Sequence, residues 1–189
     1  MNVQHECHLS ENMESGFKKG SSREVTGMHE LTITIQWSGP YTVKRIIKEM
    51  TKGGRYPDYD GDDYGLYQIY GTHILCGEDT LIYVGKAINQ RFSTRFKQHS
   101  GAWLADEEDV QIYLGRIYDP KRHSAKDNWG LWKKDAELAE KIMIYKYSPP
   151  YNSSSINKAP SLKPYRNVRL VHKGKRYKLK QKDNAPKEW

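Results

Sequence analysis

The sequence predicts an α+β protein with a small, mostly antiparallel sheet of three strands, flanked by helices. Three short runs, residues 64–70, 80–85 and 110–118, have the aromatic and branched apolar composition of strands. Residues 89–100 and 133–147 repeat apolar side chains at helical spacing. Strands and helices that follow one another over such short distances are typical of a sheet with helices packed against it.

The N-terminal part is predicted to comprise a tail and an attachment to this core. Residues 1–28 are polar and lack periodicity, so a disordered tail is expected. Residues 29–62 would form the attachment. Within it, residues 31–37 alternate apolar and polar side chains, which predicts a half-buried strand. Residues 42–52 repeat apolar side chains at helical spacing and stop at Gly53, which predicts a helix.

The core elements are separated by residues that end them. Residues 71–79, between the first two strands, contain turn-forming residues and predict a turn. The second helix is followed by Ser148-Pro149-Pro150, which must stop it because proline removes a backbone donor.

Residues 153–189 are predicted to form a basic β-hairpin and a tail. Residues 168–171 and 176–179 have strand composition and flank a turn at Gly174. Four apolar side chains could then pack on one face while the basic ones line the other: Val168, Leu170, Tyr177 and Leu179.

Length and cysteine content indicate a single domain in a reducing compartment. The 189 residues suffice for one domain, and no apolar run approaches the ~20 residues that span a bilayer. The N-terminus lacks the apolar stretch of a signal peptide. Two cysteines are no disulfide framework, so we expect a cytoplasmic protein without membrane association.

The net charge of +8 is concentrated near the C-terminus. Residues 166–182 contain eight Lys or Arg and no Asp or Glu, and the remaining chain is balanced at 23 basic against 23 acidic residues. Such a patch is typical of a contact with a polyanion such as a nucleic acid, although a solubilising face is the alternative. The candidate DNA-binding residues are Arg91, Arg166, Arg169, Lys173, Lys175, Arg176 and Lys178.

The predicted strands and the helix after them carry side chains suited to a phosphodiester. Tyr67 and Tyr83 lie on the first two strands. In the following helix, Arg91, Arg95 and His99 are four residues apart and form one stripe. The neighbouring phenylalanines are expected to dock this helix on the sheet, which would leave the cationic stripe at the sheet edge.

The second helix places Glu140 at the border of its apolar arc. A carboxylate there can simply pair with a neighbouring cation. The functional interpretation is a hard oxygen ligand for a divalent cation that faces a phosphate.

These residues resemble the signature of the GIY-YIG nuclease superfamily. The resemblance begins with Gly65-Leu66-Tyr67 and Tyr83-Val84-Gly85-Lys86, and continues with a helix carrying Arg95 and His99. It ends with Glu140 and Pro150-Tyr151-Asn152. It covers residues 63–152 and implies a GIY-YIG-type catalytic core that cleaves DNA.

The resemblance implies a role for each matching residue. Glu140 matches the ligand of a single Mg²⁺, for which Mn²⁺ can substitute, and Arg95 matches a phosphate clamp. Arg91 is a rival for the clamp, because two extra residues precede this helix. Tyr83 would hold the water or phosphate, and Asn152 would orient the site.

The general base is left open between two side chains. Tyr67 matches the tyrosine that positions or deprotonates the attacking water, but a free phenol has a pKa near ~10. Nearby cations such as Lys86, together with the metal, are expected to lower this pKa. His99 could accept or relay the proton instead.

A core with short attachments on both sides resembles a stand-alone type II restriction endonuclease of this superfamily. A palindromic site would then require a homodimer on DNA. The alternatives are a structure-selective repair or mobile-element nuclease, and a non-catalytic DNA-binding module.

Overall fold

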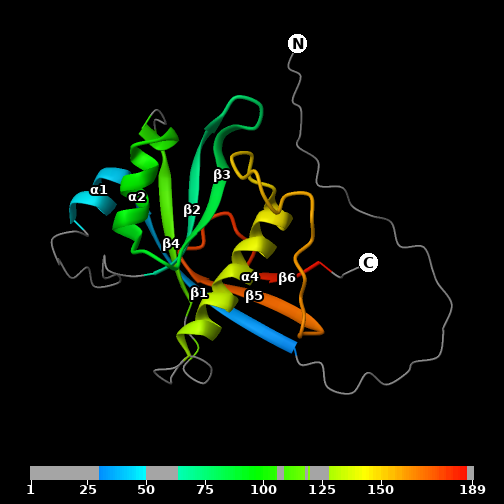
Figure 1. The fold of residues 1–189 in the computed structure, drawn as a ribbon. Helices are drawn as coiled ribbons and strands as arrows, with labels where there is room; N and C mark the ends of the chain where they lie inside the picture. Colours follow the sequence, from blue (N-terminus) through cyan, green and yellow to red (C-terminus); the bar gives the residue numbers. More distant parts are fainter. Residues whose placement is uncertain (1–29, 50–63, 106–108, 118, 120–127, 187–189) are drawn as a thin grey trace, which may run out of the picture.

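The computed structural model describes residues 30–49, 64–105, 109–117, 119 and 128–186. The predicted tail, residues 1–28, lies outside the described residues, as does the end of the predicted attachment from residue 50 onward. The described chain is an α+β structure, with one six-stranded mixed sheet and three α-helices (Figure 1). No helix within the described ranges is long and apolar enough to cross a membrane.

Up to β5 the elements follow the predicted order, and β1, β2, β3 and β5 are longer than expected. In chain order they are β1 (Glu30–Tyr41), α1 (Val43–Glu49), β2 (Gly65–His73), β3 (Gly77–Ala87), α2 (Phe92–Ser100), a short 3₁₀ helix η1 (Trp103–Ala105), β4 (Gln111–Ile117), α4 (Trp129–Tyr147), β5 (Asn167–Gly174) and β6 (Lys182–Asn184).

The prediction of a separate three-stranded sheet is wrong, because the sheet continues beyond its antiparallel trio. The strand order is β3-β2-β4-β1-β5-β6. Strands β3, β2 and β4 pair antiparallel, β1 is antiparallel to β4, and β5 is parallel to β1. Without β1, the outer edge of β4 would expose unpaired backbone groups. The predicted N-terminal attachment therefore contributes a strand to the middle of the sheet.

The predicted C-terminal hairpin is also corrected. Its first strand is β5, but its second strand is β6, which pairs antiparallel with β5 from Val171 to Arg169. Residues 176–179 form a turn instead, with Tyr177 at a left-handed φ of 55° that a strand excludes. Leu179 is buried in this turn while Tyr177 is exposed. The two side chains therefore do not pack on one face, as they would in the predicted strand.

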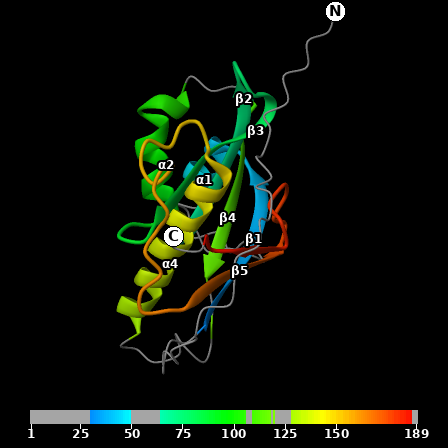
Figure 2. The same ribbon diagram turned by 90° about the vertical axis from the view of Figure 1, so that its right-hand side faces the viewer.

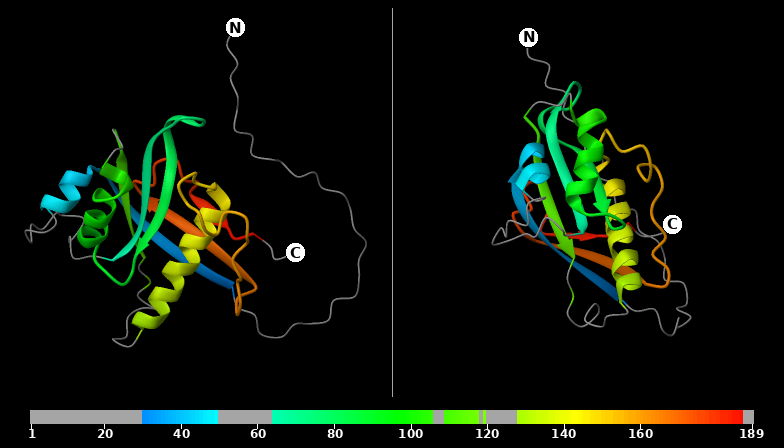
Figure 3. Two further views of the ribbon diagram at one scale, coloured as in Figure 1. Left: turned by 45° about the horizontal axis from the view of Figure 1, so that its top comes forward. Right: turned by 60° about the vertical axis from the view of Figure 1, so that its left-hand side comes forward.

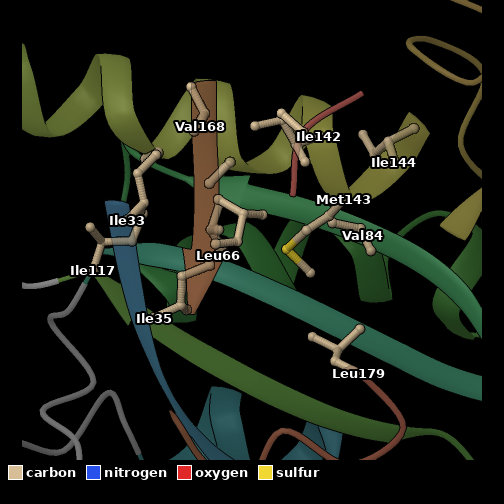
Figure 4. Packing of buried hydrophobic residues seen from close by; sticks show 14 of the residues in the cluster. Ile33, Ile35, Leu66, Val84, Ile117, Ile142, Met143, Ile144, Val168 and Leu179 are labelled. Atoms are coloured by element: carbon tan, nitrogen blue, oxygen red, sulfur yellow. The ribbon is translucent and has the colours of Figure 1, made fainter. Parts of the chain in front are cut away.

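The helices cover both faces of the sheet. Helices α1 and α2 lie on one side of β2 and β4, where Ile46, Phe92 and Phe96 are fully buried (Figures 1 and 3). The two phenylalanines thus dock α2 as predicted. Helix α4 lies on the opposite side, and its residues Ile142 and Met143 pack over the sheet (Figure 4).

The sheet is strongly twisted, so that β5 runs across the direction of β2 (Figure 2). Strand β3 is one edge of the sheet and β6 is the other. The predicted site residues gather at the β3 edge, between α2 on one face and α4 on the other.

Candidate active site

The outer edge of β3 is held by the segment that follows α4. The backbone N–H of Tyr151 donates to the carbonyl of Ile82 at 3.0 Å. The side chain of Asn152 accepts a hydrogen bond from the N–H of Val84 at 2.9 Å and donates one to the carbonyl of Val84 at 2.8 Å. Asn152 therefore acts on the backbone of β3 between the two predicted site residues Tyr83 and Lys86.

Tyr67 reaches the edge of the sheet by lying over Gly85 of the neighbouring strand. The two residues are paired in the antiparallel register of β2 and β3. A Cβ atom at Gly85 would overlap the phenol of Tyr67 and also meet the ring of Tyr83. Only glycine leaves room for this ring, so the Gly85 of the sequence motif is a packing requirement of Tyr67.

Three predicted site residues surround the hydroxyl and ring of Tyr67. His99 Nε2 lies 2.7 Å from it, and Arg95 Nε donates to it at 3.2 Å. The ring of Tyr83 stacks on that of Tyr67, with centroids 6.0 Å apart, and Tyr83 also hydrogen-bonds to Arg95. Tyr67, Tyr83, Arg95 and His99 are thus brought together as predicted.

The proton on His99 is located by Trp103, a residue that the sequence did not single out. Trp103 Nε1 donates to His99 Nδ1 at 3.2 Å. An indole N–H only donates, so Nδ1 must accept, and a neutral His99 carries its proton on Nε2. Burial, together with the charge of Arg95, lowers the pKa of His99 to about 4, so His99 is neutral at pH 7.

It follows that Tyr67 accepts two hydrogen bonds, one from Arg95 and one from His99 Nε2–H. Such donors stabilise a phenolate. Burial nevertheless raises the pKa of the Tyr67 phenol, as do Tyr83 and Glu140, while Arg95 lowers it to a smaller extent. Without a metal, burial of the ring therefore outweighs Arg95, and the expected lowering of this pKa by the metal together with nearby cations stays a prediction.

Lys86 and Glu140 form an ion pair on the other face of β3. Lys86 Nζ donates to Glu140 Oε2, and the Glu140 side chain is 12% exposed. Burial raises the pKa of Glu140, and Lys86 opposes this shift. Lys86 thus interacts directly with the predicted metal ligand and not with the Tyr67 hydroxyl.

The residues present fit one hard cation only if water and substrate complete its shell. Within the described ranges, no three His, Cys, Asp or Glu residues come together as a metal site. Mg²⁺ is commonly bound by one or two carboxylates together with water and substrate phosphates. Glu140 can supply one such carboxylate, and Lys86 already occupies its Oε2 with a positive charge.

The predicted DNA-binding residues do not form one cluster. Arg91 is exposed at the N-cap of α2. Arg176 donates to the carbonyl of Leu179, and Lys178 forms an ion pair with Asp79 Oδ2 at 2.7 Å, so both hold the C-terminal turn in place. The remaining predicted residues are exposed on or beside β5, four strands away from β3: Arg166, Arg169, Lys173 and Lys175.

No protein-family model matches the chain, and no curated protein or solved structure matches it either. The function is therefore inferred from the residues of the site and their geometry.

Proposed function

We propose that this protein is a GIY-YIG-type endonuclease that hydrolyses DNA phosphodiester bonds with one Mg²⁺, or Mn²⁺ as a substitute, at Glu140. The observation that carries the proposal is the hydroxyl of Tyr67, held over Gly85 between Arg95 and His99. A phenol, a guanidinium and a neutral imidazole converge there. The carboxylate of Glu140 is close enough that its negative charge contributes to the raised pKa of the Tyr67 phenol.

The hydrogen bonds divide the roles among these side chains. His99 donates to Tyr67 through Nε2 and accepts from Trp103 through Nδ1, so neither ring nitrogen is available to take a proton. We therefore assign the general base to Tyr67, with Arg95 and His99 as the donors that stabilise its ionised form. Tyr83 orients Arg95 and the water or phosphate.

Arg95 has donors left for a phosphate. Its Nε donates to Tyr67, its Nη1 donates to Gln98 Oε1 at 3.2 Å, and a third donor bonds Tyr83, which leaves two of the five N–H donors of a guanidinium. This favours Arg95 over Arg91 as the clamp, because Arg95 donates to the Tyr67 hydroxyl, whereas Arg91 is the N-cap residue that precedes the helix.

When bound at Glu140, the cation would polarise the scissile phosphate, stabilise the leaving oxygen and favour the ionised phenol. Lys86 would have to share Glu140 with it, because it donates to the same carboxylate. Asn152 bonds both backbone groups of Val84 and so holds the backbone of β3 between Tyr83 and Lys86.

We further propose type II restriction as the biological role, with a homodimer on palindromic DNA in the cytoplasm. In support, β1 and β5 are hydrogen-bonded into the same sheet as the site strands and are not joined to them through a long linker. A rigid arrangement of this kind suits cleavage at a fixed position within a recognition sequence.

The test is cleavage of supercoiled plasmid with Mg²⁺ or Mn²⁺ by the wild type, Glu140→Gln and the control Glu137→Gln, one turn earlier on α4. We expect Glu140→Gln to lose at least ~10²-fold in cleavage rate while it still binds DNA, and Glu137→Gln to cut nearly normally. A wild type that binds DNA but never cuts it with either metal would overturn the proposal in favour of a binding module.

The biological role has a separate readout. Cutting at one short sequence, with protection by methylation of that sequence, supports restriction. Cutting confined to branched DNA would replace restriction by structure-selective repair and leave the chemistry intact.

A further inference from the structure

One half of a sheet face is covered by helices and the other half is polar and open. On the side of the sheet that α1 and α2 occupy, the strands β2 and β4 present buried residues such as Ile69 and Leu114. Along β1, the buried side chains alternate with exposed ones and belong to the opposite face, beneath α4. The alternate residues of β1 therefore point to the same side as α2, as do those of their strand partners.

The strand register aligns these exposed residues in rows, each of which crosses three neighbouring strands. One row runs Arg116, Gln36, Lys173 from β4 through β1 to β5. Another runs Thr32, Arg169, Asn184 from β1 through β5 to β6, and Arg169 Nε donates to Asn184 Oδ1 at 3.2 Å. Cations alternate with amide and hydroxyl side chains in both rows.

The charge of this open face is strongly positive. Among the described strand residues of this face, four carry a positive charge, Arg116, Arg169, Lys173 and Lys182, and one carries a negative charge, Glu30 at its end. Asp183 of β6 is fully buried on the opposite face. Polar side chains on a half-buried sheet would serve solubility alone if their charges were mixed, whereas charges of one sign fit a polyanion.

We propose that the open face of β1, β5 and β6 binds double-stranded DNA beside the cleavage site, with Arg169, Lys173 and Lys182 as its main phosphate contacts. The inference rests on the proposed nuclease function for its choice of polyanion. A sheet face can lie against a groove, where amides and hydroxyls such as those of Gln36, Thr32 and Asn184 can bond to base edges.

The topology sets the distance between the open face and the site. Strand β5 is four strands from β3, so the two are roughly 19 Å apart along the sheet at about 4.8 Å per strand. At about 3.4 Å per nucleotide, the open face would meet the backbone roughly five to six nucleotides from the scissile phosphate. That is about half a turn of the duplex.

The inference is tested by DNA binding, measured with Glu140→Gln in all proteins so that cleavage plays no part. A fluorescent 30-base-pair duplex is titrated between about 50 and 300 mM salt with the triple variant Arg169→Gln, Lys173→Gln, Lys182→Gln. We expect the slope of log K against log salt to fall by about three units, at roughly 0.9 per phosphate contact. At about 100 mM salt, Kd should rise at least tenfold.

The matched control removes three exposed lysines from the other side of the molecule, Lys134→Gln, Lys158→Gln and Lys163→Gln, which line a pocket beside α4. Its Kd should change less than about threefold, since general charge acts weakly at a distance in salt. Equal slopes in the two triple variants would overturn the inference.

The outcomes also separate the inference from the nuclease proposal. If the otherwise wild-type protein cuts DNA but the two triple variants bind equally, the open face is rejected and the nuclease stands. If it never cuts but only the open-face variant loses binding, the face stands and the nuclease is rejected. Circular dichroism of both triple variants confirms that they are folded.

Discussion

Two histidines of this protein each accept a hydrogen bond from a tryptophan at Nδ1, and they differ in the group that lies at Nε2. Trp103 donates to Nδ1 of His99, and Trp37 donates to Nδ1 of His172 at 3.0 Å. In both cases the indole N–H requires a neutral imidazole to carry its proton on Nε2. Nε2 of His99 then faces the hydroxyl of Tyr67, while that of His172 faces Asp183 Oδ2 at 3.2 Å.

The two regions also share a glycine beneath an aromatic ring. Tyr67 lies over Gly85, and Trp37 lies over Gly115, where a Cβ atom would come within 2.5 Å of the indole. In each region the missing side chain lets a large ring cross the neighbouring strand and present its polar atom to a histidine.

The difference lies in the group that accepts the Nε2 proton. Asp183 is fully buried and also accepts from Tyr147 Oη at 2.6 Å and pairs with Lys146 at 2.8 Å. That network joins β5, β6 and α4 around one ionised carboxylate, so its effect is on stability. At His99 the acceptor is a phenol that still has a proton to lose, beside Arg95 at the edge of the sheet. The same local arrangement thus stabilises the fold in one place and, in the other, holds the phenol that we propose as the general base.

The largest difference is expected when each histidine is removed. His172→Ala should lower the free energy of unfolding by about 3–5 kcal/mol, because it leaves a buried carboxylate short of a donor and opens a cavity. His99→Ala should cost about 1–2 kcal/mol and reduce cleavage instead. Urea unfolding of both variants measures the difference, and equal losses of stability would contradict the division of roles.

The pH dependence of stability should separate the two regions into different windows. His99 has a folded-state pKa of about 4, below its ordinary value, so the unfolded chain takes up the proton first. Stability should therefore fall as the pH drops from about 6.5 to about 4, by up to roughly 3 kcal/mol. The control His99→Gln should no longer show this fall in stability between about pH 6.5 and 4.

Asp183 contributes in a lower window. Its hydrogen bonds from His172, Lys146 and Tyr147 outweigh burial, which acts in the opposite direction, and lower its pKa to about 2. Its contribution is complete above about pH 4 and is lost as the pH falls toward 2, by about 2 kcal/mol. In urea unfolding at several pH values, Asp183→Asn should remove the pH dependence of stability between about pH 4 and 2 only. A change between about pH 6.5 and 4 would show that the two networks are coupled.

The glycines provide a smaller, matched comparison. Gly85→Ala and Gly115→Ala should each cost about 1–3 kcal/mol through overlap with the ring above. Only Gly85→Ala should also abolish cleavage per folded molecule, because it displaces the hydroxyl of Tyr67. Gly130→Ala in α4 is the control, since its Cβ would meet nothing within 4 Å, and it should be neutral or slightly stabilising. Normal cleavage by folded Gly85→Ala would rule out the assigned role of Tyr67.

The smallest expected effect on stability is that of Trp103→Phe, about 1 kcal/mol for one hydrogen bond. It frees Nδ1 of His99, so the proton should redistribute between the ring nitrogens, and ¹⁵N NMR of the imidazole reads this directly. The cleavage rate should fall roughly tenfold, because the Tyr67 oxygen loses the hydrogen bond from His99 Nε2–H in molecules whose proton is on Nδ1. Trp129→Phe, at a half-exposed indole, is the control. An unchanged His99 tautomer in Trp103→Phe would remove Trp103 from the site.

Regular spacing explains why much of the site was predictable. Arg95 and His99 share one helix face, and Tyr67 pairs across two adjacent strands with the Gly85 of the motif, so local periodicity suffices to find them. Trp103 lies beyond the end of α2 in a 3₁₀ turn, where no periodicity applies. Whether it reaches His99 depends on how that turn closes.

The fold was predictable only where contacts are local. The strand and helix positions followed from composition, but the place of β1 in the sheet depends on pairing with β4 and β5, which are distant in sequence. Tyr177 and Leu179 have the spacing of a strand but lie in a turn, where Tyr177 stacks on Tyr113 and stays exposed while Leu179 is buried. The raised pKa of the Tyr67 phenol could not be predicted, because burial of its ring depends on tertiary packing.

The parallel pairing of β1 with β5 has a consequence for biosynthesis. Trp37 and His172, which are hydrogen-bonded between these two strands, are 135 residues apart in the chain. While the ribosome is still making the second half of the protein, β1 has no permanent partner on the side that β5 will occupy. Such an open strand can capture other nascent chains. A shortened product that stops before residue 167 should therefore precipitate, because its β1 never acquires the partner strand β5.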